Sequence, residues 1–368
     1  MEQTMETKQV VVNAAPTRYI QKAGLLRELG KWCRPLCQGG SVLVVAAPHI
    51  LKEQSAAIKA GFTRSGIRAE LEEFGGECSN AEISRLRGIM IRNHCTLIVG
   101  IGGGKVLDTA KAVAHFAQSP VAVAPTAASS DAPCSALSVL YTEDGKLDRY
   151  LPLNQNPQLV LADSAVISAA PPRLLIAGMG DALSTWYEAK ACMLSNGKTG
   201  VGGNCGAAAL ALARGCRDIL FATGAKAVED VKAGNLTNAV EQVIEVNLYL
   251  SGLGFESGGL AAAHAISNGF AELGICPSVM HGELVAFGTL VQLVLEKDQN
   301  ELPHVLEFCQ QMGLPTTLED LGCANLGEEL LLMAAEKACS DKYSMSNMPF
   351  EVLPSDLCRA MVALNHLI

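Results

Sequence analysis

The chain has 368 residues, of which 49% are hydrophobic and 18% are charged. That length allows two domains of ordinary size, and the apolar content excludes a disordered chain because enough apolar surface is available to form a core. The formal net charge is −9 and no run of lysine or arginine occurs, which excludes the basic surface that nucleic acid or anionic lipid requires. We therefore expect a compact protein whose partner is a small molecule.

The 13 cysteines are spread from Cys33 to Cys358 without a C-x-x-C pair. This spacing favours reduced thiols over a disulfide framework or a thiolate zinc knuckle, and reduced thiols are typical of the cytoplasm. Residues 1–19 carry charges of both signs and no apolar core, which is unlike a signal peptide. No stretch approaches the roughly 20 apolar residues of a membrane span, so we expect a cytoplasmic protein.

Up to about Asp163, short β-branched runs alternate with helical stretches. The predicted strands cover residues 41–47, 67–74, 96–100, 120–126 and 158–163. This alternation is typical of βαβ units and predicts a mostly parallel sheet. The first predicted domain, residues 1–163, is therefore an α/β domain.

After Ser164 the strand signals nearly vanish, and periodic stretches rich in Ala, Leu and Glu replace them. The clearest of these helical stretches cover residues 182–194, 205–221, 236–250 and 283–297. The second predicted domain, residues 164–368, is thus all helical. A ligand site is expected where the two domains meet.

The segment GIGGGKVLDTAKA, residues 100–112, follows a predicted strand and opens a helix. Glycines let a ligand approach the backbone closely, and the positive end of the helix attracts an anion, so phosphate is the expected guest. The spacing matches neither G-x-G-x-x-G nor a P-loop. A tight turn that merely needs small residues is the alternative, and Lys105, just after the glycines, favours phosphate.

Two of the seven histidines, His264 and His281, lie near glycines in helical sequence and are expected to face inward. A lone inward histidine is more often a core residue than a ligand, so both interpretations stay open. Asp181 follows a glycine turn and is expected to open an apolar helix, where it offers a third ligand for a site that keeps one position open. The alternative for Asp181 is a plain N-cap.

Five longer segments carry a more specific pattern: GIGGGKVLDTAKAVAHF, SSDAPCSALSVLYTEDG, GMGDALSTWYEA, YLSGLGFESGGLAAAHAISNGF and HGELVAFGTLVQLVLE. Together they resemble the glycerol dehydrogenase family of the iron-containing alcohol dehydrogenase superfamily, in order over most of the chain. The resemblance implies a dehydroquinate synthase-like architecture. In it, an N-terminal α/β dinucleotide-binding domain and an all-helical metal-binding domain meet at a cleft that holds both ligands.

According to this resemblance, the metal ligands are Asp181, His264 and His281. These three are also expected to be catalytic residues. The fourth expected catalytic residue is Asp131, which would contact the substrate hydroxyls. One carboxylate and two imidazoles suit Zn²⁺, and iron-using members have another histidine where this chain has Thr185. Zinc is therefore the expected metal, acting as a Lewis acid on the substrate oxygen while a hydride passes to or from the cofactor.

The resemblance also implies a nicotinamide cofactor, NAD or NADP. The implied contacts are Gly103, Gly104 and Lys105 at the pyrophosphate, and Thr126, Ser135, Leu137 and Tyr141 around the nicotinamide. In the family, the second strand ends in an aspartate that binds the adenosine ribose and selects NAD, and this position is Ala47 here. Without the carboxylate, use of NADP becomes possible or NAD binding weakens. His49 is either a phosphate contact or a solvated loop residue.

Other positions also depart from the family pattern. Ser267 and Ser346 stand where the family usually has histidines, and Phe350 follows where glycine is usual. Groups around a metal tune its ligands, so these changes indicate a shifted substrate rather than a loss of function.

The leading hypothesis is a zinc-dependent NAD(P) alcohol dehydrogenase that acts on a small polyol, a vicinal diol or the corresponding hydroxyketone. The alternatives are a 2-oxo acid reductase, for which only Arg173 suggests a cation, and a catalytically silent dinucleotide-binding protein. A dehydroquinate synthase-like lyase is disfavoured, because its phosphorylated acid needs several cations near the histidines. Members of the family are generally oligomeric, so a homo-oligomer is expected.

Overall fold

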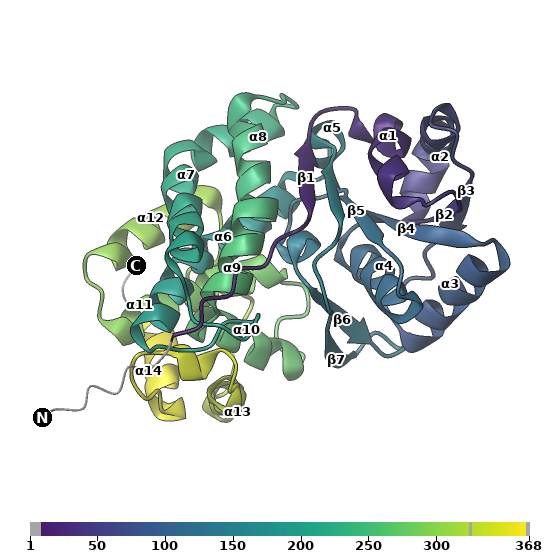
Figure 1. Ribbon diagram of the computed structural model, residues 1–368. Helices are drawn as coiled ribbons and strands as arrows, with labels where there is room; N and C mark the ends of the chain where they lie inside the picture. Colours follow the sequence, from purple (N-terminus) through teal and green to yellow (C-terminus); the bar gives the residue numbers. More distant parts are fainter. Residues whose placement is uncertain (1–8, 324–325, 366–368) are drawn as a thin grey trace, which may run out of the picture. The chain divides into compact units, whose positions relative to one another are not determined.

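The computed structural model describes residues 9–323 and 326–365 (Figure 1). The expectation about a signal peptide concerns residues 1–19, and residues 1–8 of that segment lie outside the described residues. Within the described ranges, no helix is both long enough and apolar enough to cross a membrane.

The chain divides into two compact units. The first, which we call the sheet unit, consists of Ala15–Met179 and Thr223–Gly252. The second, the helical unit, consists of Met1–Ala14, Gly180–Ala222 and Leu253–Ile368. The change from strand-rich to helical sequence predicted at residue 163 lies inside the sheet unit, because this unit also includes later helical segments. For example, Gln21 Nε2 at the sheet edge donates to the backbone oxygen of Glu241 at 2.8 Å.

The sheet unit is built on six parallel strands in the order β1-β8-β5-β4-β2-β3. Their bounds are β1 (Arg18–Gln21), β2 (Ser41–Ala46), β3 (Ala69–Glu73), β4 (Cys95–Gly102), β5 (Val121–Pro125) and β8 (Leu159–Ala162). All five predicted strands are present, and β1 is an additional short edge strand. Strands β2, β5 and β8 are buried throughout, which explains their continuous apolar runs.

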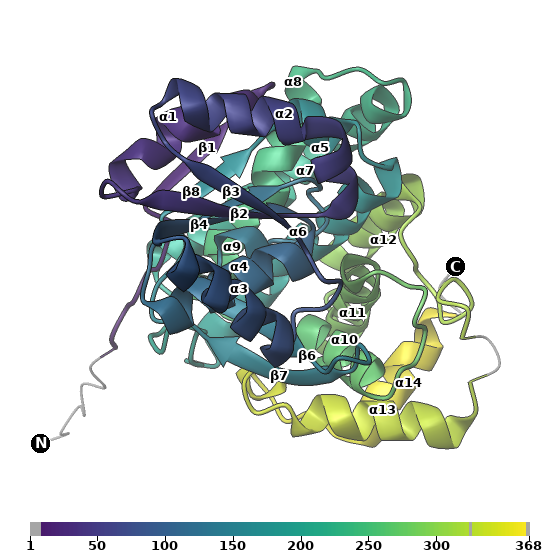
Figure 2. The same cartoon turned by 90° about the vertical axis from the view of Figure 1, so that its right-hand side faces the viewer.

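Helices cover both faces of this sheet. Figure 2 shows α1 and α2 above the sheet and α3 and α4 below it. The bounds are α1 (Leu29–Cys33), α2 (Pro48–Arg64), α3 (Asn80–Arg92), α4 (Gly104–Ala117) and α5 (Ser164–Ser168). Along the chain, β3 lies on one side of β2, whereas β4, β5 and β8 continue on the other side. The strand order therefore reverses between β2 and β4, and ligands of such sheets bind outside the carboxyl ends at this point.

An antiparallel hairpin, β6 (Leu137–Tyr141) and β7 (Leu147–Pro152), was not expected from the sequence. It lies against α4, where Ser138 Oγ donates to the backbone oxygen of Asp108 at 3.0 Å. Its turn contains Gly145 at φ +82°, a left-handed conformation that glycine adopts readily. The Asp-Gly pair at this turn was the available signal for a hairpin.

From Pro172 onward, every regular element of the described residues is helical. The bounds are α6 (Pro172–Leu194), α7 (Ala207–Lys232), α8 (Asn238–Glu245), a π-helical segment (Val246–Leu250), α9 (Ser251–Gly258), α10 (Ala262–Glu272), α11 (His281–Glu296), α12 (Glu301–Met312), α13 (Glu328–Ser340), a 3₁₀ turn (Met345–Asn347) and α14 (Pro354–Leu364). The α/β and all-helical expectation is confirmed.

Three helices of the helical unit approach one another closely where glycine replaces a side chain. A Cβ atom at Gly180 of α6 would lie 2.4 Å from the backbone oxygen of Gly282 in α11. A Cβ atom at Gly288 of α11 would lie 2.5 Å from the backbone oxygen of Ala263 in α10. Neither distance tolerates a side chain, so glycine is required for α6, α10 and α11 to meet. Each candidate metal ligand is the chain neighbour of one of these contact residues.

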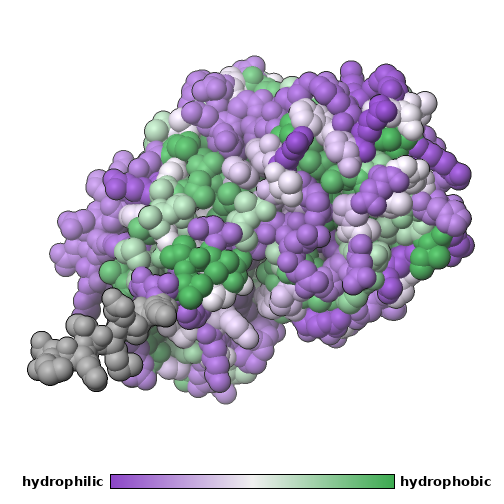
Figure 3. Space-filling view, viewed as in Figure 1, coloured by the Kyte–Doolittle hydropathy of each residue, from purple (hydrophilic) through white to green (hydrophobic). Residues whose placement is uncertain are grey.

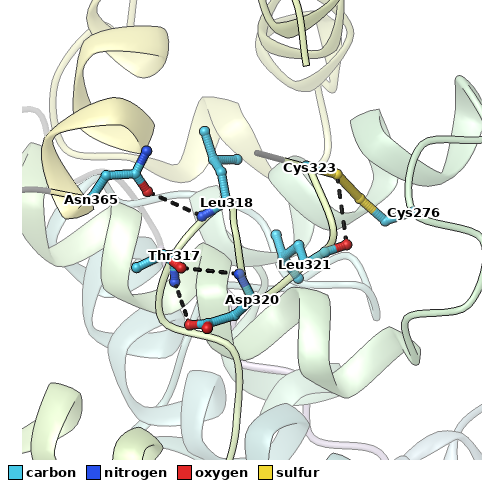
Figure 4. Close-up of a disulfide and its surroundings, with 7 residues drawn as sticks. All are labelled: Cys276, Thr317, Leu318, Asp320, Leu321, Cys323 and Asn365. Atoms are coloured by element: carbon cyan, nitrogen blue, oxygen red, sulfur yellow. Dashed lines mark hydrogen bonds between the residues drawn. A yellow bond between two sulfur atoms is a disulfide. The ribbon is translucent and has the colours of Figure 1, made fainter. Parts of the chain in front are cut away.

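One pair of cysteines departs from the expectation of reduced thiols. Cys276, in the loop before α11, forms a disulfide with Cys323, in the loop before α13 (Figure 4). The other 11 cysteines are free thiols. Sequence spacing missed the pair because the two loops converge only in the folded chain. The cytoplasmic expectation stays a prediction.

Candidate metal centre and nucleotide site

Asp181, His264 and His281 come together in the helical unit, from α6, α10 and α11. Nε2 of His264 and Nε2 of His281 each lie 3.4 Å from Oδ1 of Asp181. One ligand atom from each residue lies within 4.8 Å of the others. From the sequence, metal binding and core packing were both possible for these residues. In the structure, the three donor atoms lie close enough together to bind one metal ion.

Asp181 does not open its helix, so the N-cap interpretation is wrong. Helix α6 begins at Pro172, well before Asp181. The glycines that suggested a turn instead serve close packing, since a Cβ atom at Gly178 would lie 2.0 Å from the backbone oxygen of Ala128. A carboxylate in the interior of a helix, buried to 1% exposure, needs a polar or ionic partner rather than a helix end.

The charges of the three residues fit a cation. Burial on its own would raise the pKa of Asp181, but the neighbouring His281 and His264 lower it well below its usual range. Burial would likewise lower the pKa of His264, but Glu188 and Asp181 raise it well above its usual value. The carboxylate is therefore ionised at neutral pH, and the centre attracts positive charge, either as protons or as a metal ion. One carboxylate oxygen and two imidazole nitrogens are a donor set that divalent transition metals accept.

The two imidazoles differ in their access to solvent. The side chain of His264 is 9% exposed, whereas that of His281 is 48% exposed. His281 is the first residue of α11, so its ring lies at the end of a helix rather than along its side. Solvent can therefore reach the three residues from the His281 side.

The neighbouring positions that depart from the family pattern have partners of their own. Thr185 is buried, and its methyl group would lie 2.7 Å from a Cβ atom at Gly254 of α9, so this position is closely packed. Ser267 Oγ lies 3.3 Å from Nδ1 of His281. Ser346 is exposed and donates to the backbone oxygen of Lys342 at 2.5 Å. Only Ser267 of these two serines contacts a candidate ligand.

The sequence interpretation missed Glu188. This residue follows Asp181 by two helical turns on α6 and is fully buried, and its Oε2 lies 2.6 Å from Nδ1 of His264. The available signal was a second carboxylate at a helical repeat from Asp181 in an otherwise apolar stretch. Nothing in the spacing pointed to His264, which lies 76 residues further along the chain.

In the sheet unit, the glycines of residues 100–104 have two different surroundings. A Cβ atom at Gly100 would lie 2.7 Å from Cβ of Ala110, and one at Gly102 would lie 2.6 Å from Cγ2 of Val106. These two glycines therefore allow β4 and α4 to pack. Gly103 and Gly104 would meet nothing within 4 Å, and neither has a positive φ.

Neither packing nor backbone conformation thus requires glycine at Gly103 and Gly104, which stand at the start of α4. A ligand that comes close to the backbone would account for these two glycines, and the start of a helix favours an anion. The nearby ammonium group of Lys105 lies 2.7 Å from Oε1 of Glu77 and 4.8 Å from the centre of the Tyr141 ring. In this structure Lys105 is therefore paired with a carboxylate.

Two other predicted cofactor residues of this unit, Ala47 and Thr126, lie at neighbouring strand ends. Ala47 follows β2 and donates its N–H to the backbone oxygen of Ile101 at 3.0 Å, and Thr126 follows β5 and donates to that of Gly102 at 3.0 Å. With Gly103 after β4, they line the carboxyl ends of three adjacent strands. Ala47 offers only a methyl group there, and His49 is exposed in the first turn of α2.

The segment that carries Ser135 and Leu137 is held by Lys111, a second residue that the sequence interpretation missed. The Lys111 side chain is fully buried on α4 and pairs with Oδ1 of Asp108 at 2.9 Å. Its ammonium group also donates to the backbone oxygens of Ala132, at 3.0 Å, and Leu137. These bonds tie the predicted nicotinamide segment to the helix that starts at the glycine turn.

Asp131 belongs to the sheet unit and is 6% exposed. Its Oδ2 accepts a hydrogen bond from Ser251 Oγ at 2.7 Å, which fixes the orientation of the carboxylate. The predicted role of Asp131 at the substrate hydroxyls stays a prediction.

Comparison with known proteins gives three kinds of similarity. A sequence model described as "Iron-containing alcohol dehydrogenase" matches residues 16–164. The chain is 47% identical to a glycerol dehydrogenase from Escherichia coli over 95% of each chain. Among solved structures, it resembles a probable glycerol dehydrogenase from Sinorhizobium meliloti, with 40% identity and TM-score 0.90 over 97% of this chain and 99% of that one. It also resembles a glycerol dehydrogenase from Schizosaccharomyces pombe, with 37% identity and TM-score 0.93 over 97% and 91% of the chains.

Proposed function

The chain belongs to the iron-containing alcohol dehydrogenase family, and on that premise we propose that it transfers a hydride between a small polyol or vicinal diol and a nicotinamide, with Zn²⁺ as its metal. As a member of the family, it is an oxidoreductase of CH–OH groups that uses a divalent metal and an NAD-type cofactor. The polyol assignment is supported by the similarity to proteins named glycerol dehydrogenase over nearly the whole chain.

The observation that carries the proposal is the convergence of Asp181, His264 and His281. These three residues would hold the metal, which supplies Lewis-acid polarisation of the substrate oxygen when bound. The ionised Asp181 contributes the negative charge, and substrate would approach from the side of the half-exposed His281. Gly103 and Gly104 would bring the pyrophosphate close to the start of α4, so the chain mainly binds and orients the two reactants.

Zinc rather than iron is supported by the residue one turn after Asp181. Thr185 offers a hydroxyl and a methyl group where a histidine would add a third imidazole, and its position is closely packed. The donor set of one carboxylate and two imidazoles with an open position is typical of catalytic zinc.

Two other functions have less support. A 2-oxo acid reductase needs a cation for the substrate carboxylate, and the one candidate from the sequence, Arg173, is exposed at the start of α6. A catalytically silent protein has no physical need for three donors aimed at one point around a buried carboxylate.

A homo-oligomer is also part of the proposal. Figure 3 shows clusters of hydrophobic side chains among hydrophilic ones on the face in view. Exposed apolar clusters of this kind are surfaces on which another protein molecule can pack.

The test uses protein purified without added metal. Elemental analysis is expected to find a stoichiometric divalent metal, with zinc predominant, and a panel of polyols, vicinal diols and 2-oxo acids is then screened with NAD and NADP by nicotinamide absorbance. Turnover of diols or polyols supports the proposal. Turnover of 2-oxo acids alone would refute the substrate assignment, and cofactor binding without metal or turnover would favour the silent protein.

Cofactor choice gives a second test at Ala47. Replacing it with aspartate places a carboxylate at the carboxyl end of β2, where it would accept from the ribose hydroxyls and repel a 2′-phosphate. We expect Ala47→Asp to raise the ratio of kcat/KM for NAD to that for NADP by about tenfold or more, since opposed like charges cost several kcal/mol. The control is Ala47→Asn, which has similar size but no charge. A ratio that moves equally in both variants would contradict the charge argument.

A further inference from the structure

Both carboxylate oxygens of Glu188 contact groups at the start of helix α10. Its Oε1 accepts from the backbone N–H of Ala261, at 2.8 Å, and of His264, at 2.9 Å. Its Oε2 lies 2.6 Å from Nδ1 of the His264 ring. Glu188 is fully buried, and these contacts compensate the cost of removing its carboxylate from water.

This carboxylate also caps α10 from outside the helix. The N-cap residue Ala261 has no side chain that can accept, and the first N–H groups of α10 are instead bonded by side chains of other helices. Glu188 of α6 bonds two of them, and Oε1 of Gln292 of α11 accepts from the N–H of Ala263 at 3.2 Å. A negative charge at a helix start is further stabilised by the helix dipole.

The contact with His264 decides which ring nitrogen is available. A carboxylate can only accept, so the nitrogen beside Oε2 carries a proton, and that nitrogen is Nδ1. In a neutral imidazole the proton on Nδ1 leaves the lone pair on Nε2, the nitrogen that lies 3.4 Å from Asp181. We propose that Glu188 is a positioning residue that fixes His264 with its proton on Nδ1, so that Nε2 is presented to the metal beside Asp181.

Capping alone does not require a carboxylate at this position. A glutamine has one acceptor oxygen and one donor group, so it can accept from the α10 backbone or from Nδ1–H of His264, but it cannot do both. The buried Gln292 shows that a neutral amide is sufficient to cap Ala263 in the same helix turn. The second acceptor of Glu188 is thus needed for His264 rather than for the fold.

The first experiment compares Zn²⁺ affinity in the full-length enzyme by competition with a chromophoric chelator. We expect Glu188→Gln to weaken Zn²⁺ binding by about 10- to 100-fold, the usual loss when the partner of a ligating histidine is changed. The control is Gln292→Met, which removes a cap from the same helix without touching His264, and it should leave Zn²⁺ affinity within about threefold while lowering thermal stability. Equal losses in both variants, or unchanged affinity in Glu188→Gln, would overturn the proposal.

A second experiment needs no variant at Glu188. The wild-type enzyme, labelled with ¹⁵N-histidine and loaded with ¹¹³Cd²⁺, should show cadmium coupling to Nε2 of His264 and a proton on Nδ1, with His264→Ala identifying the signal. Coupling to Nδ1 of His264 would overturn the proposal even if Glu188→Gln did not fold.

This inference rests on the proposed metal site, and the two fail separately. Wild-type enzyme that binds neither Zn²⁺ nor Cd²⁺ would remove the metal site itself. Wild-type enzyme that binds through Nδ1 of His264, or a Glu188→Gln variant with normal affinity, would remove only the role of Glu188.

Discussion

The two candidate imidazole ligands are held in opposite ways. His264 lies in the first turn of α10, is 9% exposed, and has a buried carboxylate 2.6 Å from Nδ1. His281 is 48% exposed, and its Nδ1 lies 3.3 Å from the hydroxyl of Ser267. A charged partner in a buried setting holds a ring more firmly than a hydroxyl near solvent. His264 is therefore part of the core, whereas His281 can adjust.

The chain around His281 is consistent with this difference. His281 is the first residue of α11 and directly follows a loop, so its ring has the helix on one side only. His264, in contrast, lies on a helix whose first N–H groups are bonded by two other helices. We infer that the centre has one fixed imidazole and one adaptable imidazole, with substrate approaching from the adaptable side.

The largest effect is expected from His264→Ala. Turnover should fall by about 1000-fold or more, because loss of a ligand removes several kcal/mol of metal-based stabilisation. Dinucleotide binding, followed by the quenching of protein fluorescence, should be largely spared, since the predicted cofactor residues lie in the sheet unit. Near-normal turnover in this variant would exclude His264 as a ligand.

The stability of the metal-free protein should also respond to His264→Ala. The variant leaves the buried Asp181 and Glu188 without their shared imidazole, and breaking a buried pair costs roughly 3 kcal/mol or more. Urea unfolding in the presence of a chelator measures this loss against the wild-type chain.

His281→Ala should be equally inactive but much less destabilised. Its ring is half exposed and has one buried carboxylate partner rather than two, so the free energy of unfolding of the metal-free protein should fall by less than in His264→Ala. The same unfolding experiment compares the two alanine variants directly. If both lose the same stability, the distinction between a fixed and an adaptable imidazole is wrong.

The sequence predicted the sheet better than it predicted the centre. Buried parallel strands are continuous apolar runs, so β2, β4, β5 and β8 could be found from a few residues each. The edge strand β1 and the hairpin β6–β7 were missed because they carry no continuous apolar run, whereas the half-exposed β3 was still predicted. In the centre, the family pattern indicated which residues would meet, but not what holds them.

Three features of the centre could not be predicted because they depend on contacts between distant segments. Glycines next to Asp181 suggested a turn, whereas they allow α6 to pack closely inside a long helix. Glu188 acquires its role only when α10 folds against α6. The bond between Cys276 and Cys323 requires two loops 47 residues apart to converge. Local sequence patterns specify helices and strands, whereas these features depend on how those elements pack against one another.

The smallest effect is expected from Ser267→Ala, which removes the hydroxyl beside Nδ1 of His281. A neutral hydrogen bond contributes about 1 kcal/mol, so zinc release to a chelator should become about fivefold faster, while thermal stability changes little. The rate is measured by mixing zinc-loaded enzyme with excess chromophoric chelator. The control is Ser346→Ala, which removes the hydroxyl of an exposed serine that is bonded to its own turn, and it should leave the release rate unchanged.

The comparison between Ser267→Ala and Glu188→Gln then shows which of the two imidazoles contributes more to retention of the metal. A larger change in zinc binding for Glu188→Gln means that the fixed ring dominates retention of the metal, as the contact distances of 2.6 Å and 3.3 Å suggest. A larger change for Ser267→Ala would mean that the exposed ring controls retention. Zinc would then leave through loss of His281 at a rate set by one hydroxyl, and the serine in place of the family's usual histidine would be a direct determinant of how tightly this chain keeps its metal.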